Sequence, residues 1–200
     1  NYYQQLSRSK NNEKHPEYKY IYAHSLLKNY KPEQAIEIFR QLYEFNKNNT
    51  YIITGLAQSL LASRDNKNHK QGLELLDKAL QERPLDMVLS AYYAQALIHM
   101  GKITQSIKFI KKYNQYSLGQ PFFYKLLSRA YAKQGESLKA HIAQADYYYL
   151  RGQYKQAITQ VSLAKKQAKK DSSDDFYSLS RLDSKLLEIK AEQEKYKLKM

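Results

Sequence analysis

The sequence of 200 residues contains no cysteine and no tryptophan. Without cysteine the chain can form neither a disulfide nor a thiolate metal site, although this absence does not indicate a cellular compartment. No run of about 18 apolar residues is present, so we expect no helix that spans a membrane. Residues 1–14 are polar and carry no apolar signal-peptide core, and we interpret them as a linker.

The sequence motifs of several catalytic sites are missing as well. There is no HExxH, no glycine-rich phosphate loop and no Gly-x-Ser-x-Gly segment. The histidines do not have the spacing of metal ligands. We therefore expect no catalysis, no metal and no cofactor within these residues.

Acidic residues are scarce, since 19 Asp and Glu stand against 33 Lys and Arg, for a net charge of +14. Such a charge favours anionic partners, which include acidic proteins, lipid headgroups and nucleic acid. Alternatively, lysine is simply the solubilising residue of this chain. Lysine is densest at 108–112 and 165–170, and neither cluster has the Arg and Gly pattern of a nucleic-acid-binding segment. We therefore do not expect nucleic acid as the partner.

Small residues recur along the chain with a step of 34 residues. Ala23 and Ala57 are separated by this step, and Gly72, Ser106 and Ala140 repeat it. A helix–turn–helix period of about 34 residues is the signature of tetratricopeptide repeats, in which small residues let two helices approach closely. The pattern predicts an all-α superhelix of about ten antiparallel helices that ends in a C-terminal capping helix.

The step is irregular at two places. Ala94 follows Ala57 by 37 residues, and we place the extra residues in the turn at 64–68, so the next helix is expected from Lys70. Near Ala145 the step falls to 17 residues. The helix expected over 137–150 then ends one repeat and opens a further hairpin, because every helix of such an array has a neighbour on each side.

The expected domain covers residues 15–200 and follows the linker at 1–14. Its expected parts are repeats near 16–49, 50–86, 87–120 and 121–150, an overlapping hairpin at 138–169 and a capping helix at 174–198.

The first helix of each repeat is expected to line the concave face and to bind a protein or peptide, a partner with acidic character in view of the net charge. The repeat register predicts which residues of these helices face the concave surface, and we take the polar and aromatic ones as candidates for binding. These candidates are Tyr20, His24, Lys28, Tyr51, Gln58, Gln95, Lys125, Arg129, Lys133 and Tyr149.

Three of these candidates form a basic stripe, because Lys125, Arg129 and Lys133 lie at i, i+4 and i+8 of one helix. The stripe can bind carboxylates, with Arg129 as a bidentate donor; the alternative is a solvated helix face. It does not match the Lys/Asn arrangement that binds chaperone C-terminal tails. Tyr149 is the member of a tyrosine triple that projects inward, where its alternative role is packing in the core.

The last third of the chain carries a narrower resemblance. Residues 145–152 read Ala-Asp-Tyr-Tyr-Tyr-Leu-Arg-Gly, and residues 175–183 read Asp-Phe-Tyr-Ser-Leu-Ser-Arg-Leu-Asp. With Gln-Ala-Ile at 156–158, this part resembles the C-terminal tetratricopeptide domain of periplasmic zinc metallopeptidases of the β-barrel assembly-enhancing protease type.

This resemblance implies a periplasmic location and a surface that recruits substrates or outer-membrane assembly machinery. It also implies that zinc belongs to a peptidase domain of the parent protein, outside these residues. Since the chain begins with Asn1 and not with Met, we expect a fragment or a processed product. Two alternatives stay open: an independent cytosolic tetratricopeptide scaffold that binds an acidic protein or peptide, and a basic helical repeat associated with nucleic acid.

Overall fold

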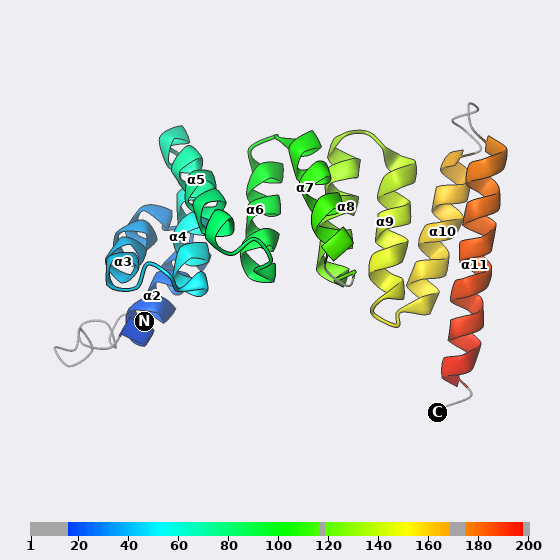
Figure 1. Cartoon of the computed structure of the whole chain (residues 1–200), viewed down its shortest axis with the longest axis horizontal. Helices are drawn as coiled ribbons and strands as arrows, with labels where there is room; N and C mark the ends of the chain where they lie inside the picture. The colour runs from blue at the N-terminus through cyan, green and yellow to red at the C-terminus, as the bar shows by residue number, and fades with distance from the viewer. Residues whose placement is uncertain (1–15, 117–118, 169–174, 198–200) are drawn as a thin grey trace. The chain divides into compact units, whose positions relative to one another are not determined.

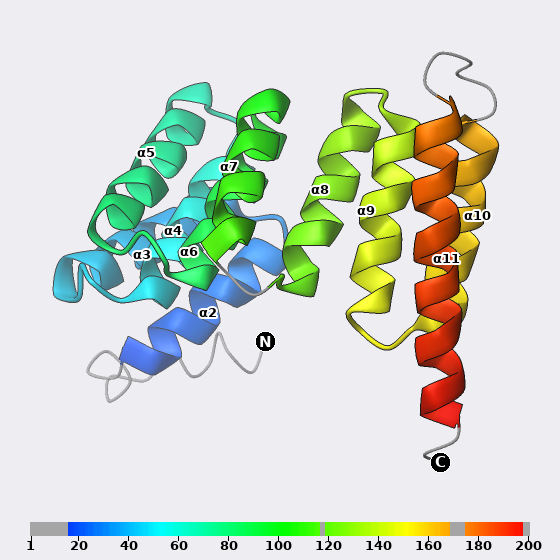
Figure 2. The same ribbon diagram turned by 45° about the vertical axis from the view of Figure 1, so that its right-hand side comes forward.

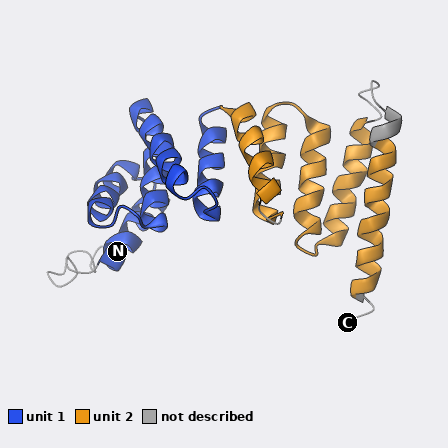
Figure 3. Cartoon of the chain, in the orientation of Figure 1, with its two compact units in different colours: residues 1–101 blue, residues 102–200 orange. Residues whose placement is uncertain are grey.

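The computed structural model describes residues 16–116, 119–168 and 175–197. Within these ranges the chain forms ten α-helices and no β-strand, which confirms the all-α prediction (Figure 1). The linker expected at 1–14 lies outside the described residues. The chain divides into two compact units, residues 1–101 and 102–200 (Figure 3), and each is described by itself.

Unit 1 consists of helical hairpins in which each helix packs against the next along the chain. Helix α4 also contacts α2 and α6, so these three helices, each the first of its hairpin, are spatial neighbours. The helices of unit 1 are α2 (Pro16–Lys28), α3 (Pro32–Phe45), α4 (Thr50–Ala62), α5 (Asn66–Glu82) and α6 (Met87–His99).

Side-chain caps begin several of these helices. The Asn49 carboxamide oxygen accepts hydrogen bonds from the backbone N–H groups of Tyr51 and Ile52, at 2.9 and 3.2 Å. The Asp86 carboxylate caps α6 in the same way. Such caps satisfy backbone donors that have no partner inside the helix, so they set where each hairpin turns.

The end of α2 has an unusual turn residue. Gly101, Gly135 and Gly152 follow α6, α8 and α9 with φ of 73°, 81° and 69°, and Tyr30 takes this place after α2 with φ of 56°. The turn is closed by the backbone N–H of Lys31, which donates to the Leu26 carbonyl at 3.0 Å. A left-handed conformation suits glycine and is costly for a tyrosine.

Close approach of helices explains why small residues mark the repeat. Ala23 and Ala57 are fully buried. A Cβ built on Gly72 would lie 3.1 Å from the Ala57 carbonyl oxygen, and one built on Gly55 would lie 2.4 Å from the Phe39 ring. A larger residue would crowd the facing backbone at Gly72 and would displace the buried Phe39 ring at Gly55, because protein interiors are close-packed.

The predicted start of α5 is wrong. The helix begins at Asn66, where Lys70 was expected, and it spans 17 residues. Asp65 caps it by accepting the backbone N–H of Lys67 at 2.8 Å. The extra residues of this repeat therefore lengthen the helix and leave a short turn, because Asp65 offers a cap within the segment that was expected to be a loop.

Unit 2 continues the alternation of antiparallel helices. Helix α9 packs against both α8 and α10, which accommodates the half-step of the repeat. Helices α9, α10 and α11 lie side by side in both Figure 1 and Figure 2. The helices of unit 2 are α7 (Ile103–Tyr116), α8 (Pro121–Lys133), α9 (Ser137–Tyr149), α10 (Tyr154–Ala168) and α11 (Asp175–Lys197).

Helix α11 occupies the position of the expected capping helix. Its Leu182 and Ile189 are buried with Val161 of α10 and Ala145 of α9. Leu187, on the same helix, is 70% exposed, so α11 is amphipathic and covers the last hairpin with one face.

Candidate partner-binding surfaces

The ten predicted site residues divide between the two units. Unit 1 holds Tyr20, His24, Lys28, Tyr51, Gln58 and Gln95, and unit 2 holds Lys125, Arg129, Lys133 and Tyr149.

In unit 1, Tyr20 and His24 surround the buried ring of Phe39. The ring centroids of Tyr20 and His24 are 4.5 Å apart, and those of His24 and Phe39 are 5.2 Å apart, both in edge-on geometry. Burial, and then the neighbouring Lys28, lower the pKa of His24. Both effects favour the neutral form of the imidazole, and its ring packs against the core residue Phe39.

A third tyrosine joins Tyr20 and Tyr51 in unit 1. Burial raises the pKa of Tyr20, and the phenols of Tyr92 and Tyr51 raise it further, so both of these tyrosines lie within electrostatic reach of Tyr20. The three tyrosines come from α2, α4 and α6. Tyr92 was missed because the repeat register selected Gln95 from this helix and did not select Tyr92.

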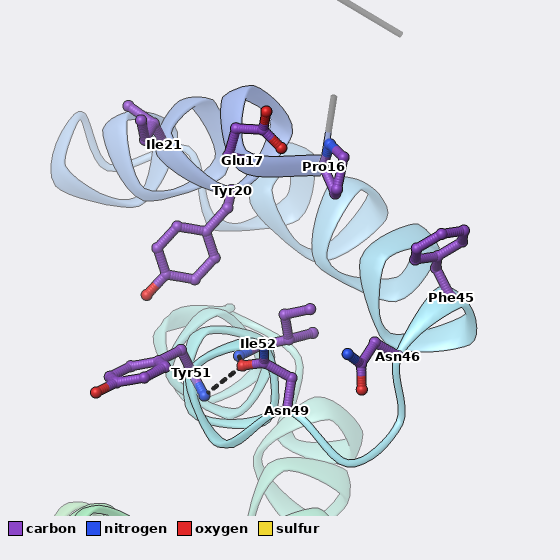
Figure 4. A pocket seen from close by; sticks show the side chains of 9 residues that line it. All are labelled: Pro16, Glu17, Tyr20, Ile21, Phe45, Asn46, Asn49, Tyr51 and Ile52. Carbon is purple, nitrogen blue, oxygen red and sulfur yellow. Dashed lines mark hydrogen bonds between the residues drawn. The ribbon is translucent and has the colours of Figure 1, made fainter. Parts of the chain in front are cut away.

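A pocket of about 590 Å³ opens beside Tyr20 and Tyr51 (Figure 4). Apolar side chains on its wall are left exposed: Phe45 is 82% and Ile21 is 43% accessible. Glu17 is the one charged residue among those that line it. The lining residues are Pro16, Glu17, Tyr20, Ile21, Phe45, Asn46, Asn49, Tyr51 and Ile52.

The other candidates of unit 1 lie outside this lining. Lys28 is exposed, and Gln58 and Gln95 are half-buried. Of the six candidates that the repeat register selected in unit 1, two line the pocket, namely Tyr20 and Tyr51.

In unit 2, the basic stripe of α8 is exposed along its whole length, at Lys125, Arg129 and Lys133. The Lys125 ammonium lies 5.7 Å from the ring centroid of Tyr147, and the Arg151 guanidinium lies 5.4 Å from the same centroid. Two cations therefore share one aromatic ring, which is an attractive arrangement.

Tyr149 is held by the capping helix. Burial raises the pKa of Tyr149 to about 12, together with a hydrogen bond between its hydroxyl and the Glu188 carboxylate of α11. Its ring also lies 6.0 Å from that of Tyr154. The hydroxyl thus has a partner inside unit 2, and its role toward a ligand stays a prediction.

Among the described residues, no group of three His, Asp or Glu side chains lies close enough to hold a metal ion. In the same part of the chain, none of the helices combines the length and the apolar character needed to cross a membrane.

Comparisons with known proteins place the fold. No family model and no curated protein matches the chain. Two solved structures of MamA are similar to this chain. They are the RS-1 ArsTM double mutant, with a TM-score of 0.55, and MamA 41-end from Desulfovibrio magneticus RS-1, with a TM-score of 0.54. Each is 16% identical in sequence, and each match covers 89% of this chain and 96% of the MamA chain. A third is TTC0263, a thermophilic tetratricopeptide protein of Thermus thermophilus, with TM-score 0.49, 20% identity and coverage of 92% and 89%.

At these identities the similarity concerns the fold. With the 34-residue period and the successive antiparallel hairpins, the chain has an all-α fold of the tetratricopeptide type. The structures named here do not bear on a zinc metallopeptidase, so that origin stays a prediction.

Proposed function

We propose that this chain is a non-catalytic protein-binding domain and that the pocket of unit 1 holds an apolar peptide segment of its partner. The observation that carries the proposal is the pocket of about 590 Å³, which is lined by Tyr20 and Tyr51 and by two exposed apolar side chains, Ile21 and Phe45. Contiguous exposed apolar groups mark interaction sites, and aromatic residues are enriched at the centre of interfaces.

The rim of the pocket suits a peptide backbone. The carboxamide oxygen of Asn49 is engaged by the backbone of α4, which orients its NH₂ group as a donor. The exposed Asn46 adds a second carboxamide at the same edge. An apolar floor with polar groups at the edge is the arrangement by which peptide side chains and peptide carbonyls are bound together.

Site-specific photocrosslinking tests this function. A benzophenone amino acid is placed at Tyr51, which is 63% exposed in the pocket, and separately at Tyr30, which is 94% exposed in the turn after α2. We expect Tyr51 to crosslink a discrete partner in the native cell extract, and Phe45→Ala to reduce that product. Equal products from both positions would overturn the pocket as the binding site.

A finer proposal concerns the parent protein. The resemblance of residues 145–152 and 175–183 supports a periplasmic metallopeptidase, whose zinc domain would receive proteins recruited here, including those of outer-membrane assembly. The gene upstream of Asn1 tests it, because a signal peptide and an HExxH motif are expected there. A reading frame without them would instead support a cytosolic scaffold for acidic proteins.

A further inference from the structure

Unit 2 contains a second pocket, of about 370 Å³, built by α7, α8, α9 and α11. None of its residues belongs to the predicted site. The lining residues are Lys111, Tyr124, Leu127, Tyr131, Leu138, Lys139, Ile142, Ala143, Asp146, Arg181, Leu182 and Lys185.

Four cations and a single carboxylate line this pocket, and two of the cations are engaged within unit 2. Lys185 forms an ion pair with Asp146. Lys139 pairs with Glu136, with an Nζ to Oε2 distance of 2.7 Å. These two lysines therefore have less capacity for a further anion than Lys111 and Arg181.

Among the residues that the structure describes, no ion pair involves Lys111 or Arg181, so these two cations provide the unbalanced positive charge there. The Lys111 ammonium lies 5.8 Å from the ring centroid of Tyr131, on the pocket wall. Arg181 is close enough to Asp146 to lower the pKa of that carboxyl, although no direct ion pair joins them among the described residues. A guanidinium is well suited to bind a second carboxylate through paired hydrogen bonds.

The environment of Asp146 indicates that charges in this pocket interact strongly. Burial is the largest influence on its pKa and raises it, against the opposing effects of Lys185 and Arg181. Burial also raises the pKa of Tyr124 on the same wall. Solvent therefore screens the charge of Asp146 poorly, whereas Lys111 and Arg181 are exposed and accessible to an incoming anion.

The rest of the lining is apolar. Leu127 and Leu182 are buried, and Leu138 and Ile142 are half-buried. A free inorganic anion would use only the charged half of such a pocket. A peptide that places a carboxylate next to an apolar side chain would use both halves, and the volume suits a short segment.

The charge of the whole unit agrees with an acidic partner. Residues 102–200 carry 20 Lys and Arg against 9 Asp and Glu, whereas residues 1–101 carry 13 against 10. Unit 2 therefore has a net charge of +11 and unit 1 a net charge of +3. Most of the positive electrostatic field that would attract an acidic segment comes from unit 2.

We propose that the pocket of unit 2 binds an acidic peptide segment of a partner protein, with Arg181 and Lys111 as the partners of its carboxylate and Leu138 and Ile142 against the neighbouring apolar side chain. The inference rests on the protein-binding function proposed above but uses a different pocket, so the failure of one leaves the other testable.

The test uses a fluorescein-labelled peptide that alternates Glu and Leu, in fluorescence anisotropy titrations of the whole chain. We expect the double variant Lys111→Gln/Arg181→Gln to bind this peptide about tenfold more weakly, because charge-assisted hydrogen bonds to its carboxylate are lost. The matched control is Lys112→Gln/Lys190→Gln, which removes the same charge from exposed positions of the same two helices and is expected to bind as the native chain does. Circular dichroism is used to check that both variants stay folded.

Comparisons between the two double variants and between different labelled ligands give the outcomes that would overturn the proposal. Equal weakening by both double variants would mean that net charge, and not the pocket, binds the peptide. Unchanged binding of a peptide with Gln in place of Glu would remove the carboxylate from recognition. Equally strong, pocket-dependent binding of single-stranded oligothymidylate would assign the pocket to nucleic acid.

A gain-of-binding variant keeps the test independent of loss of structure. Asp146→Asn releases Lys185 from its ion pair and removes the one carboxylate of the lining. We expect it to bind the Glu/Leu peptide about threefold more tightly, because the competing carboxylate is removed and Lys185 becomes available. Weaker binding by a variant of native helicity would contradict the proposed role of these charges.

Discussion

Unit 1 carries 13 basic and 10 acidic residues, and its pocket is lined by aromatic and apolar side chains with Glu17 as the one charged group. Unit 2 carries 20 basic and 9 acidic residues, and its pocket is lined by four cations around Asp146. Both are built from the same antiparallel hairpins with small residues at the helix crossings. The fold therefore does not determine the chemistry of the surface.

The two units also differ in what supports their candidate surfaces. In unit 1 the side chains of the surface pack on the core, since Tyr20 and His24 contact the ring of Phe39. In unit 2 the stripe of α8 is exposed. A change in the core should therefore reach the surface of unit 1, whereas charge changes on α8 should leave stability unaffected.

The largest effect is expected from Phe39→Ala. The side chain is fully buried, so its loss should cost about 3–5 kcal/mol of stability through lost burial and the cavity left behind. Tyr20 and His24 would lose their support, and crosslinking from Tyr51 should fall. Urea unfolding measures the first effect. Retained binding of the Glu/Leu peptide by unit 2 would show that the two surfaces are independent, and its loss would contradict the comparison.

Charge reversal on α8 is expected to act on binding alone. Lys125→Glu/Arg129→Glu should weaken capture of an acidic partner by about tenfold without lowering helicity. Pull-down and circular dichroism measure the two quantities. The control is Lys155→Glu/Lys166→Glu, which changes the net charge equally at exposed positions of α10. If the control weakens capture as much, the stripe is a solvated face.

The turn after α2 should respond in the opposite direction from the corresponding turn of unit 2. Tyr30→Gly relieves a left-handed tyrosine that is 94% exposed and should stabilise the chain by about 0.5–1 kcal/mol. Gly135→Ala, at the matching position after α8, should destabilise it by about 1 kcal/mol. Thermal unfolding measures both changes in stability. A loss of stability in Tyr30→Gly would show that the left-handed conformation of Tyr30 is not strained.

The smallest effect concerns pH. Burial lowers the folded-state pKa of His24 below the ordinary value of 6.5, so the unfolded chain binds this proton first as pH falls. Stability should therefore be unaffected by His24 above pH 6.5 and should decrease as pH falls below it. Urea unfolding across this range, compared with His24→Gln, measures the contribution. An equal pH dependence in the variant would assign it to other groups.

Much of the helical framework was predictable from local signals. Ala23, Ala94, Ala145 and Ala157 mark the register because a helix crossing tolerates only a small side chain, and all four are fully buried. The start of α5 was not predicted, because the cap at Asp65 competes with a loop in a polar segment whose sequence is compatible with both.

The sites were less predictable than the helices. Repeat register selected Tyr20 and Tyr51 but not Tyr92, and it gave no sign that Tyr149 would bond Glu188, a residue 39 positions away on another helix. Such contacts depend on how packed helices are rotated and separated, and the 34-residue period does not specify either quantity.

By itself, the sequence determined the helix–turn–helix period, the positions of close helix contact, the excess of basic residues and the absence of disulfides. These are local or compositional properties, and each follows from residue size, charge or type. Only the tertiary structure decided which side chains gather into pockets. In the tertiary structure Ile21 and Phe45 line one pocket of unit 1, and Lys111 and Arg181 line one pocket of unit 2. The physical reason is that a pocket requires several helices, each of which contributes only a few of its walls.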